Sequence, residues 1–151
     1  MPGWTRDADI ARLPRAERTI FLAANCNAKV LNDGVDGWLA MVGEHRIGTT
    51  ATALRRVGAQ NAADVIARLP RLLHAYERLE AAGNDVSDHS RASWKRHRAL
   101  QRRVQAFRNR LDARYSATAE NVRCLVITFA REALRKDPSA FAWRSHRPPV
   151  I

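Results

Sequence analysis

The sequence predicts an all-α protein, a compact single-domain helical bundle of five to seven helices. Apolar residues recur at three- and four-residue steps along most of the chain, and no segment alternates as a strand does. Gly, Asn and Pro divide this pattern into separate helices. The 151 residues, 46% of them hydrophobic, suffice for one core. We expect an irregular N-terminal lead-in at 1–14, a helical domain at 15–137 and a C-terminal tail at 138–151.

The first part of the domain is expected to hold two helices with a break between them. Residues 15–31 carry apolar side chains at helical spacing, and Cys26 lies on that side, so it should be a small core residue. Residues 32–34, Asn-Asp-Gly, favour a break. A short helix over 36–42 should then bury Trp38, which we expect in the core.

Two more helices are expected in the middle of the chain. Thr49 or Thr50 can cap the first of them, because a threonine oxygen accepts a hydrogen bond from a free backbone N–H. Gly58 suits the C-terminal end of that helix. The second covers about 61–81. Pro70 falls inside it, which predicts a kink or a split because proline cannot donate the helical hydrogen bond.

The helix expected at 91–115 is the most informative element of the sequence. It follows a polar loop in which Ser87 or Asp88 is a candidate N-cap. One side of the helix is an apolar seam, and most of the remainder is basic. Trp94 lies at the margin of the basic side and is expected to pack on a neighbouring helix. The alternative is that it stacks a base or lies on a partner. The seam consists of Leu100, Val104, Phe107 and Leu111.

The last helix is expected over 118–136, and Asp137-Pro138 should end it. Cys124 lies on the apolar side of this helix and is predicted to be a core residue, like Cys26. Two cysteines without a Cys-x-x-Cys pair form no disulfide framework, and no signal peptide is found, so we expect a cytoplasmic protein. No apolar run is long enough to cross a bilayer, which predicts no membrane partner.

The net charge of +11 is concentrated in one segment. Residues 91–114 hold nine basic residues and one acid, Asp112. Such a block indicates a polyanionic partner or an acidic protein surface. A solvated helix face is the alternative interpretation, and a GC-rich genome would explain arginine in place of lysine but not the missing acids. The candidate partner- or phosphate-binding residues are Arg91, Lys95, Arg98, Arg102, Arg103 and Arg110.

No pattern for catalysis or metal binding stands out in the sequence. The five histidines include no His-x-x-x-His pair, and neither cysteine lies close to one, so no zinc site is expected. Glu44-His45 lacks a nucleophile nearby, and Gly34-x-x-Gly37 lacks the strand and the lysine of a phosphate loop. We therefore expect no catalytic residue, no metal and no cofactor, and a protein that is not an enzyme.

Two segments carry a family resemblance. Residues 32–39 read Asn-Asp-Gly-Val-Asp-Gly-Trp-Leu and residues 53–59 read Ala-Leu-Arg-Arg-Val-Gly-Ala. This resembles a bacterial domain of unknown function, the DNA-mimic-protein-like family, with Asn-Gly-Gly-Phe, an aromatic pair and then Ala-Leu-x-x-Ile-Gly-Ala. Leu-Asp-Ala-Arg-Tyr at 111–115 is also similar, and the resemblance covers about 15–137. The matching positions, expected to be structural, are Asn32, Gly34, Trp38 and Gly58.

The resemblance implies an all-helical fold and, for some members, a protein-binding role, and it supplies no catalytic residue. Here Asp33 replaces the first family glycine and Val35 the phenylalanine. DNA mimicry needs carboxylates spaced like phosphates, whereas this chain is strongly basic, so mimicry is physically implausible. We predict a non-enzymatic bacterial protein-interaction module, immunity-like or regulatory, that docks an acidic partner through the basic helix. The alternative is a non-specific nucleic-acid-binding protein that uses the same arginines.

Overall fold

The computed structural model describes residues 7–84 and 90–141, and these residues form helices and turns without any strand. The all-α prediction is therefore confirmed. The helices are α1 (Asp7–Arg12), α2 (Arg15–Val42), α3 (Ile47–Arg56), α4 (Gln60–Ile66), α5 (Leu69–Asn84), α6 (Arg91–Ser116) and α7 (Ala119–Lys136), with short 3-10 turns at Glu44–Arg46 and Pro138–Ala140.

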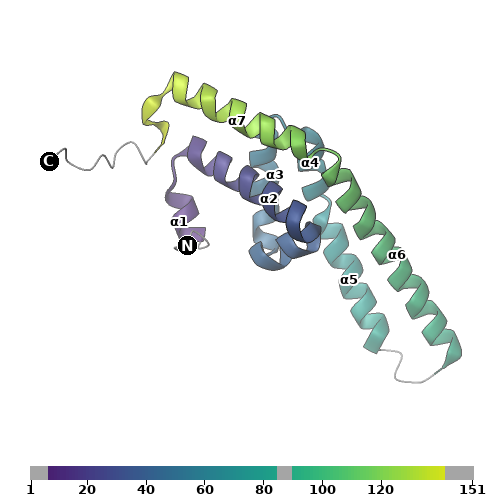
Figure 1. Cartoon of the computed structure of the whole chain (residues 1–151). Helices are drawn as coiled ribbons and strands as arrows, with labels where there is room; N and C mark the ends of the chain where they lie inside the picture. Colours follow the sequence, from purple (N-terminus) through teal and green to yellow (C-terminus); the bar gives the residue numbers. More distant parts are fainter. Residues whose placement is uncertain (1–6, 85–89, 142–151) are drawn as a thin grey trace.

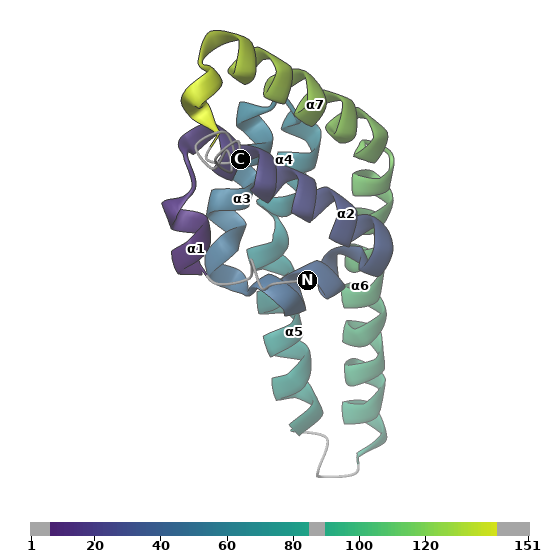
Figure 2. The ribbon, with the colours of Figure 1, turned by 60° about the vertical axis from the view of Figure 1, so that its left-hand side comes forward.

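The molecule consists of a helical body and a projecting arm (Figures 1 and 2). In the body, α2 packs against both α3 and α7, and α3 packs against α4. The arm is an antiparallel pair made by α5 and α6, which extends away from the body in both views. The root of the arm is the start of α5 and the end of α6, because the fully buried Leu69 and Tyr115 lie there.

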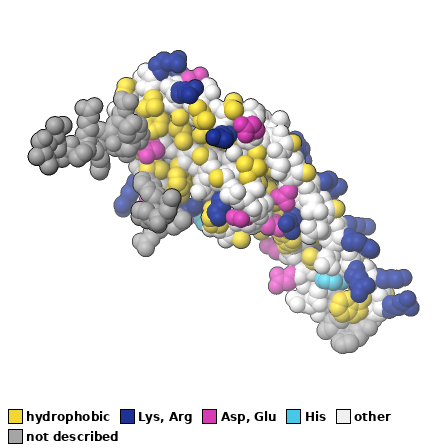
Figure 3. All heavy atoms as spheres, viewed as in Figure 1, with side chains coloured by type: hydrophobic (Ala, Val, Ile, Leu, Met, Phe, Trp, Pro, Cys, Tyr) yellow, Lys and Arg dark blue, Asp and Glu magenta, His cyan; other side chains and the backbone are white. Residues whose placement is uncertain are grey.

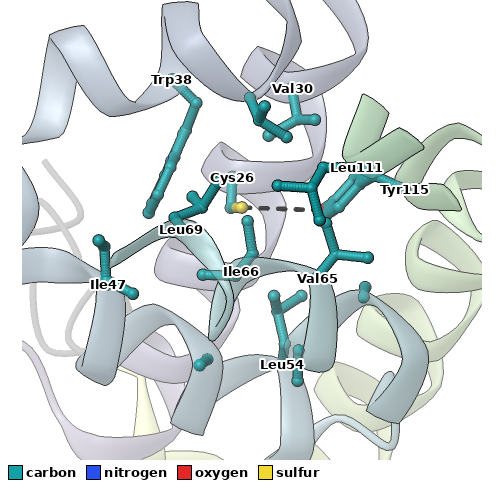
Figure 4. Packing of buried hydrophobic residues seen from close by; sticks show 14 of the residues in the cluster. Cys26, Val30, Trp38, Ile47, Leu54, Val65, Ile66, Leu69, Leu111 and Tyr115 are labelled. Atoms are coloured by element: carbon teal, nitrogen blue, oxygen red, sulfur yellow. Dashed lines mark hydrogen bonds between the residues drawn. The ribbon is translucent and has the colours of Figure 1, made fainter. Parts of the chain in front are cut away.

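The core forms where α2, α3, α4 and the root of the arm meet (Figure 4). Trp38 is its largest fully buried side chain, as predicted, and truncating such a residue costs about 3–5 kcal/mol. Cys26 is also fully buried, as predicted. The hydroxyl of Tyr115 donates to Cys26 Sγ at 3.7 Å, so α6 is joined to α2 inside the core. Burial raises the pKa of the Cys26 thiol to about 12.

The predicted break at 32–34 is a kink inside one long helix. Gly34 has φ 73° and ψ 177°, a conformation essentially reserved for glycine, while the residues on both sides stay helical. Gly58 has φ 89° and ends α3 as predicted, because its N–H donates to the Arg55 carbonyl and the next N–H donates to the Leu54 carbonyl. That pair of bonds is a Schellman motif.

Pro70 splits the predicted helix at 61–81 into two. It occupies the second position of α5, where a missing N–H costs no helical hydrogen bond. The predicted caps Thr49 and Thr50 are wrong, since α3 starts earlier, at Ile47, directly after the 3-10 turn.

Three further details differ from the sequence predictions. The lead-in is not wholly irregular, because Asp7–Arg12 forms α1 and buries Ile10. Ser90 caps α6 by accepting a hydrogen bond from the Ser93 N–H, whereas the candidates Ser87 and Asp88 lie outside the described residues. Cys124 is exposed, because α7 turns Val122 and Val126 inward and residue 124 points elsewhere around the helix.

Candidate interaction surface

The apolar seam of α6 attaches this helix to the rest of the molecule. Val104 and Leu111 are buried, and Leu100 and Phe107 are partly buried against the core cluster, as the periodicity predicted. Because this side of α6 faces inward, the other sides are left to solvent. The arrangement follows from an amphipathic helix whose polar surface is rich in arginine.

The outward sides of α6 carry a set of basic residues that we call the basic face. Every member is exposed. None forms an ion pair with a carboxylate in the two ranges that the structure describes. The basic face consists of Arg91, Lys95, Arg96, Arg98, Arg102, Arg103, Arg110 and Arg114.

Two stripes can be traced on the basic face. Arg91, Lys95, Arg98 and Arg102 follow one another at four-, three- and four-residue steps, so they form one row along the helix. The row is about 16 Å long, at about 1.5 Å per residue. Arg103 and Arg110 stand seven residues apart and mark a second row. All six predicted binding residues therefore lie on one helix of the arm.

The two helices of the arm differ in their exposed charge. The exposed face of α5 is mixed, with Arg71 and Arg78 beside Glu77 and Glu80. In Figure 3, Lys and Arg atoms line the α6 edge of the arm, whereas Asp and Glu atoms gather on its other side. A partner that approaches α6 therefore meets one sign of charge, and a partner that approaches α5 meets both.

Trp94 is exposed and not buried against a neighbouring helix as expected. Its side chain is 48% exposed. Ser93 occupies the inward position of this turn, and Trp94 lies about 100° further around the helix. The His97 ring meets the indole edge-on, with ring centroids 6.3 Å apart and planes at 89°. An aromatic ring thus lies open beside the row of cations.

A polar cluster joins the root of the arm to the kink of α2. Asp112 Oδ1 accepts a 2.8 Å hydrogen bond from the Val35 N–H, which the kink leaves without a helical partner. Arg108 Nε lies 3.0 Å from Asp36 Oδ2 and 3.6 Å from Asp112 Oδ2. Tyr76 on α5 donates to Asp36 at 2.8 Å. Together these contacts fix α2, α5 and α6 relative to one another.

This cluster explains part of the family motif and was missed at the sequence level. Burial, together with the hydrogen bond to Asp36, raises the pKa of Tyr76 to about 12, so the phenol stays a donor. The available signal was Asp112, the lone acid of a basic helix. Arg108 is one of the nine basic residues of 91–114, yet it is half-buried and paired. Its role is structural.

The four predicted motif positions have different environments. Trp38 is in the core, and Gly34 and Gly58 both have positive φ. Asn32 is exposed, and its side chain makes no hydrogen bond with any described residue.

Other kinds of site find little support in the part of the chain that the structure describes. No group of three His, Cys, Asp or Glu residues there is arranged to hold a metal ion. None of the described helices combines the length and apolar character needed to cross a membrane. One hollow, about 550 Å³, lies between α1, α2 and α3, away from the arm.

The fold and the surface define a class of protein: an all-helical domain that presents a basic helix on a projecting arm. Within that class, the chain belongs to the DMP19-like protein family, whose model matches residues 11–133. This confirms the resemblance drawn from the motifs at 32–39 and 53–59. No curated protein and no solved structure matches the chain significantly.

Proposed function

We propose that the chain is a non-enzymatic bacterial protein-interaction module, immunity-like or regulatory, that docks an acidic protein partner in the cytoplasm through the basic face of α6. The observation that carries this proposal is the set of exposed cations on one helix without a carboxylate partner in the described residues. Membership of the DMP19-like family supports a protein-binding role, since the related DNA mimics bind proteins.

The chemistry of the basic face suits carboxylates. Arginine binds a carboxylate through two parallel N–H donors, which fixes the orientation of the partner as well as attracting it. Rows of like charge also raise the rate of encounter with an acidic surface. In the unbound protein the neighbouring cations repel one another by about 0.2–0.5 kcal/mol per pair. An acidic partner would relieve that repulsion, so the surface favours occupancy.

Photo-crosslinking from inside the basic face tests the proposal. A photoreactive residue at position 98 should capture one acidic protein in the producing cell, and the adduct should survive nuclease treatment. The same residue at position 78 on α5 is the matched control, because Arg78 is also an exposed arginine of the arm. Equal capture from both positions, or adducts that nuclease removes, would argue against an acidic protein partner.

One observation favours the second candidate function, non-specific nucleic-acid binding. Trp94 is half-exposed beside Arg91 and Lys95, and an open indole next to cations is suited to stacking a base. Fluorescence anisotropy with labelled duplex and single-stranded DNA and RNA separates the candidates. Phosphate binding should weaken steeply and log-linearly with salt, and Arg98→Glu/Arg102→Glu should abolish it. Absence of binding near physiological salt would exclude this second function.

A further inference from the structure

A hollow of about 550 Å³ lies on the body of the protein, and none of its described lining residues belongs to the arm. Its walls come from α1, the N-terminal part of α2, the Glu44–Arg46 turn and α3. The volume falls within the range of sites for small molecules. Figure 2 shows the three helices that surround it, with α1 beside α3 and the start of α2.

Part of the lining is apolar. Ile10 on α1 and Ala53 on α3 are buried side chains that also line the hollow, and Leu22 on α2 contributes a half-buried one. These groups offer a hydrocarbon surface to a ligand. An apolar wall of this kind suits an aliphatic or aromatic group rather than a free inorganic ion.

The charged part of the lining is predominantly cationic. Three arginines face one aspartate, Asp7. Asp7 is already occupied, since both the Arg46 guanidinium and the His45 ring contact its carboxylate. Arg18 and Arg56 have no carboxylate partner among the described residues, and the one described contact of Arg18 is 3.4 Å to the Ala11 carbonyl. Two guanidinium groups are thus available to an anion.

The hydroxyl groups of the hollow are already used as donors. Thr19 Oγ1 donates to the Arg15 carbonyl, Thr49 to the Arg46 carbonyl and Thr52 to the Gly48 carbonyl. A neutral polar ligand would therefore find few free donors, whereas an oxyanion would find the two guanidinium groups. The two guanidinium groups therefore favour a negatively charged ligand over a neutral one.

We propose that this hollow binds a small anionic amphiphile, whose oxyanion is held by Arg18 and Arg56 and whose apolar part lies on Ile10, Leu22 and Ala53. The carboxylate of a short fatty acid and the phosphate of an alkyl ester share this chemistry. The site is independent of the basic face of α6, so failure of either proposal leaves the other intact.

Titrations of the ¹⁵N-labelled protein test this site, with octanoate, octyl phosphate and octan-1-ol as the probes. Both anions should move amide resonances of α1, the start of α2 and α3, and saturate, whereas octan-1-ol should bind at least about tenfold more weakly. The anion that binds more tightly shows whether the site prefers a carboxylate or a phosphate headgroup. Arg18→Gln and Arg56→Gln should each weaken the anions by about tenfold.

Arg55→Gln is the matched control, because Arg55 neighbours Arg56 on α3 but does not line the hollow. It should leave the affinity for octanoate unchanged. The proposal is overturned if octan-1-ol binds as well as octanoate, if Arg55→Gln and Arg56→Gln weaken binding equally, or if neither anion produces saturable shifts around the hollow.

Discussion

Asp112 on α6 accepts a 2.8 Å hydrogen bond from the backbone N–H of Val35 on α2, across a separation of 77 residues. The kink at Gly34 leaves that N–H without a helical acceptor, and the carboxylate takes its place. The second oxygen of Asp112 lies 3.6 Å from Arg108. The arm is therefore fixed to the body at the same point where α2 bends.

Replacing Gly34 should be costly. Gly34→Ala must keep φ at 73°, and its new Cβ would lie 3.1 Å from Asp112 Oδ1. We expect the free energy of unfolding, measured by urea denaturation, to fall by about 1–3 kcal/mol. Gly48→Ala is the control. Nothing lies within 4 Å of its new Cβ, and it should gain about 0.5–1 kcal/mol inside α3. Equal effects of the two substitutions would contradict this interpretation.

Asp112 should stabilise mainly through its hydrogen bond rather than through its charge. Asp112→Ala leaves the Val35 N–H without an acceptor and is expected to cost about 1.5–3 kcal/mol in urea denaturation. Asp112→Asn keeps an oxygen in place and loses only the ion pair with Arg108. The side chain of Asp112 is 27% exposed and that of Arg108 is 35% exposed. Such a pair contributes about 0–1 kcal/mol. If Asp112→Asn lowered the free energy of unfolding more than Asp112→Ala, the charge of Asp112 would matter more than its hydrogen bond.

The two thiols should react at very different rates. Cys26 is fully buried, and that burial raises its pKa to about 12. At neutral pH a reagent therefore cannot reach the sulfur, and the reactive thiolate is not formed. Cys124 is exposed. An aromatic disulfide reagent should modify one thiol rapidly in the native protein and the second only on unfolding. Cys124→Ser should remove the fast phase, and a fast phase that persists in this variant would place Cys26 within reach of solvent.

Relieving charge repulsion on the basic face should stabilise the unbound protein. Arg98 lies three residues from Lys95 and four from Arg102, so Arg98→Glu turns two repulsive pairs into attractive ones. We expect the free energy of unfolding to rise by about 0.5–1 kcal/mol at low salt, and the gain to shrink in about 1 M salt because the charges are exposed. Destabilisation would mean that Arg98 makes a contact needed for folding.

Features that depend on local spacing could be predicted from the sequence alone. The seam of α6, the burial of Trp38 and the helix end at Gly58 follow from helical periodicity and from the conformational freedom of glycine. The predictions for Cys124 and Trp94 failed because the direction of a side chain also depends on which neighbouring helix is present. Both Cys124 and Trp94 are exposed.

The residues of the candidate surface could be predicted from the sequence, but the projection of the arm that carries them could not. The missing acids between 91 and 114 indicated where the basic face lies. The projection of the arm depends on the cluster that joins Asp112 to Val35 and Arg108 to Asp36. Such contacts connect distant positions in the chain, so no local pattern reveals them. The hollow beside Arg18 and Arg56 was unpredictable for the same reason, because three helices form it.

The most direct test is the dissociation constant of the acidic protein captured from position 98, measured for the wild type and two charge-reversed variants. Arg98→Glu/Arg102→Glu should weaken binding by at least about tenfold, which corresponds to about 1.4 kcal/mol. Arg71→Glu/Arg78→Glu changes the net charge equally on α5 and should leave binding within about twofold. Equal weakening by both variants would contradict docking on α6, because net charge alone would then account for the binding.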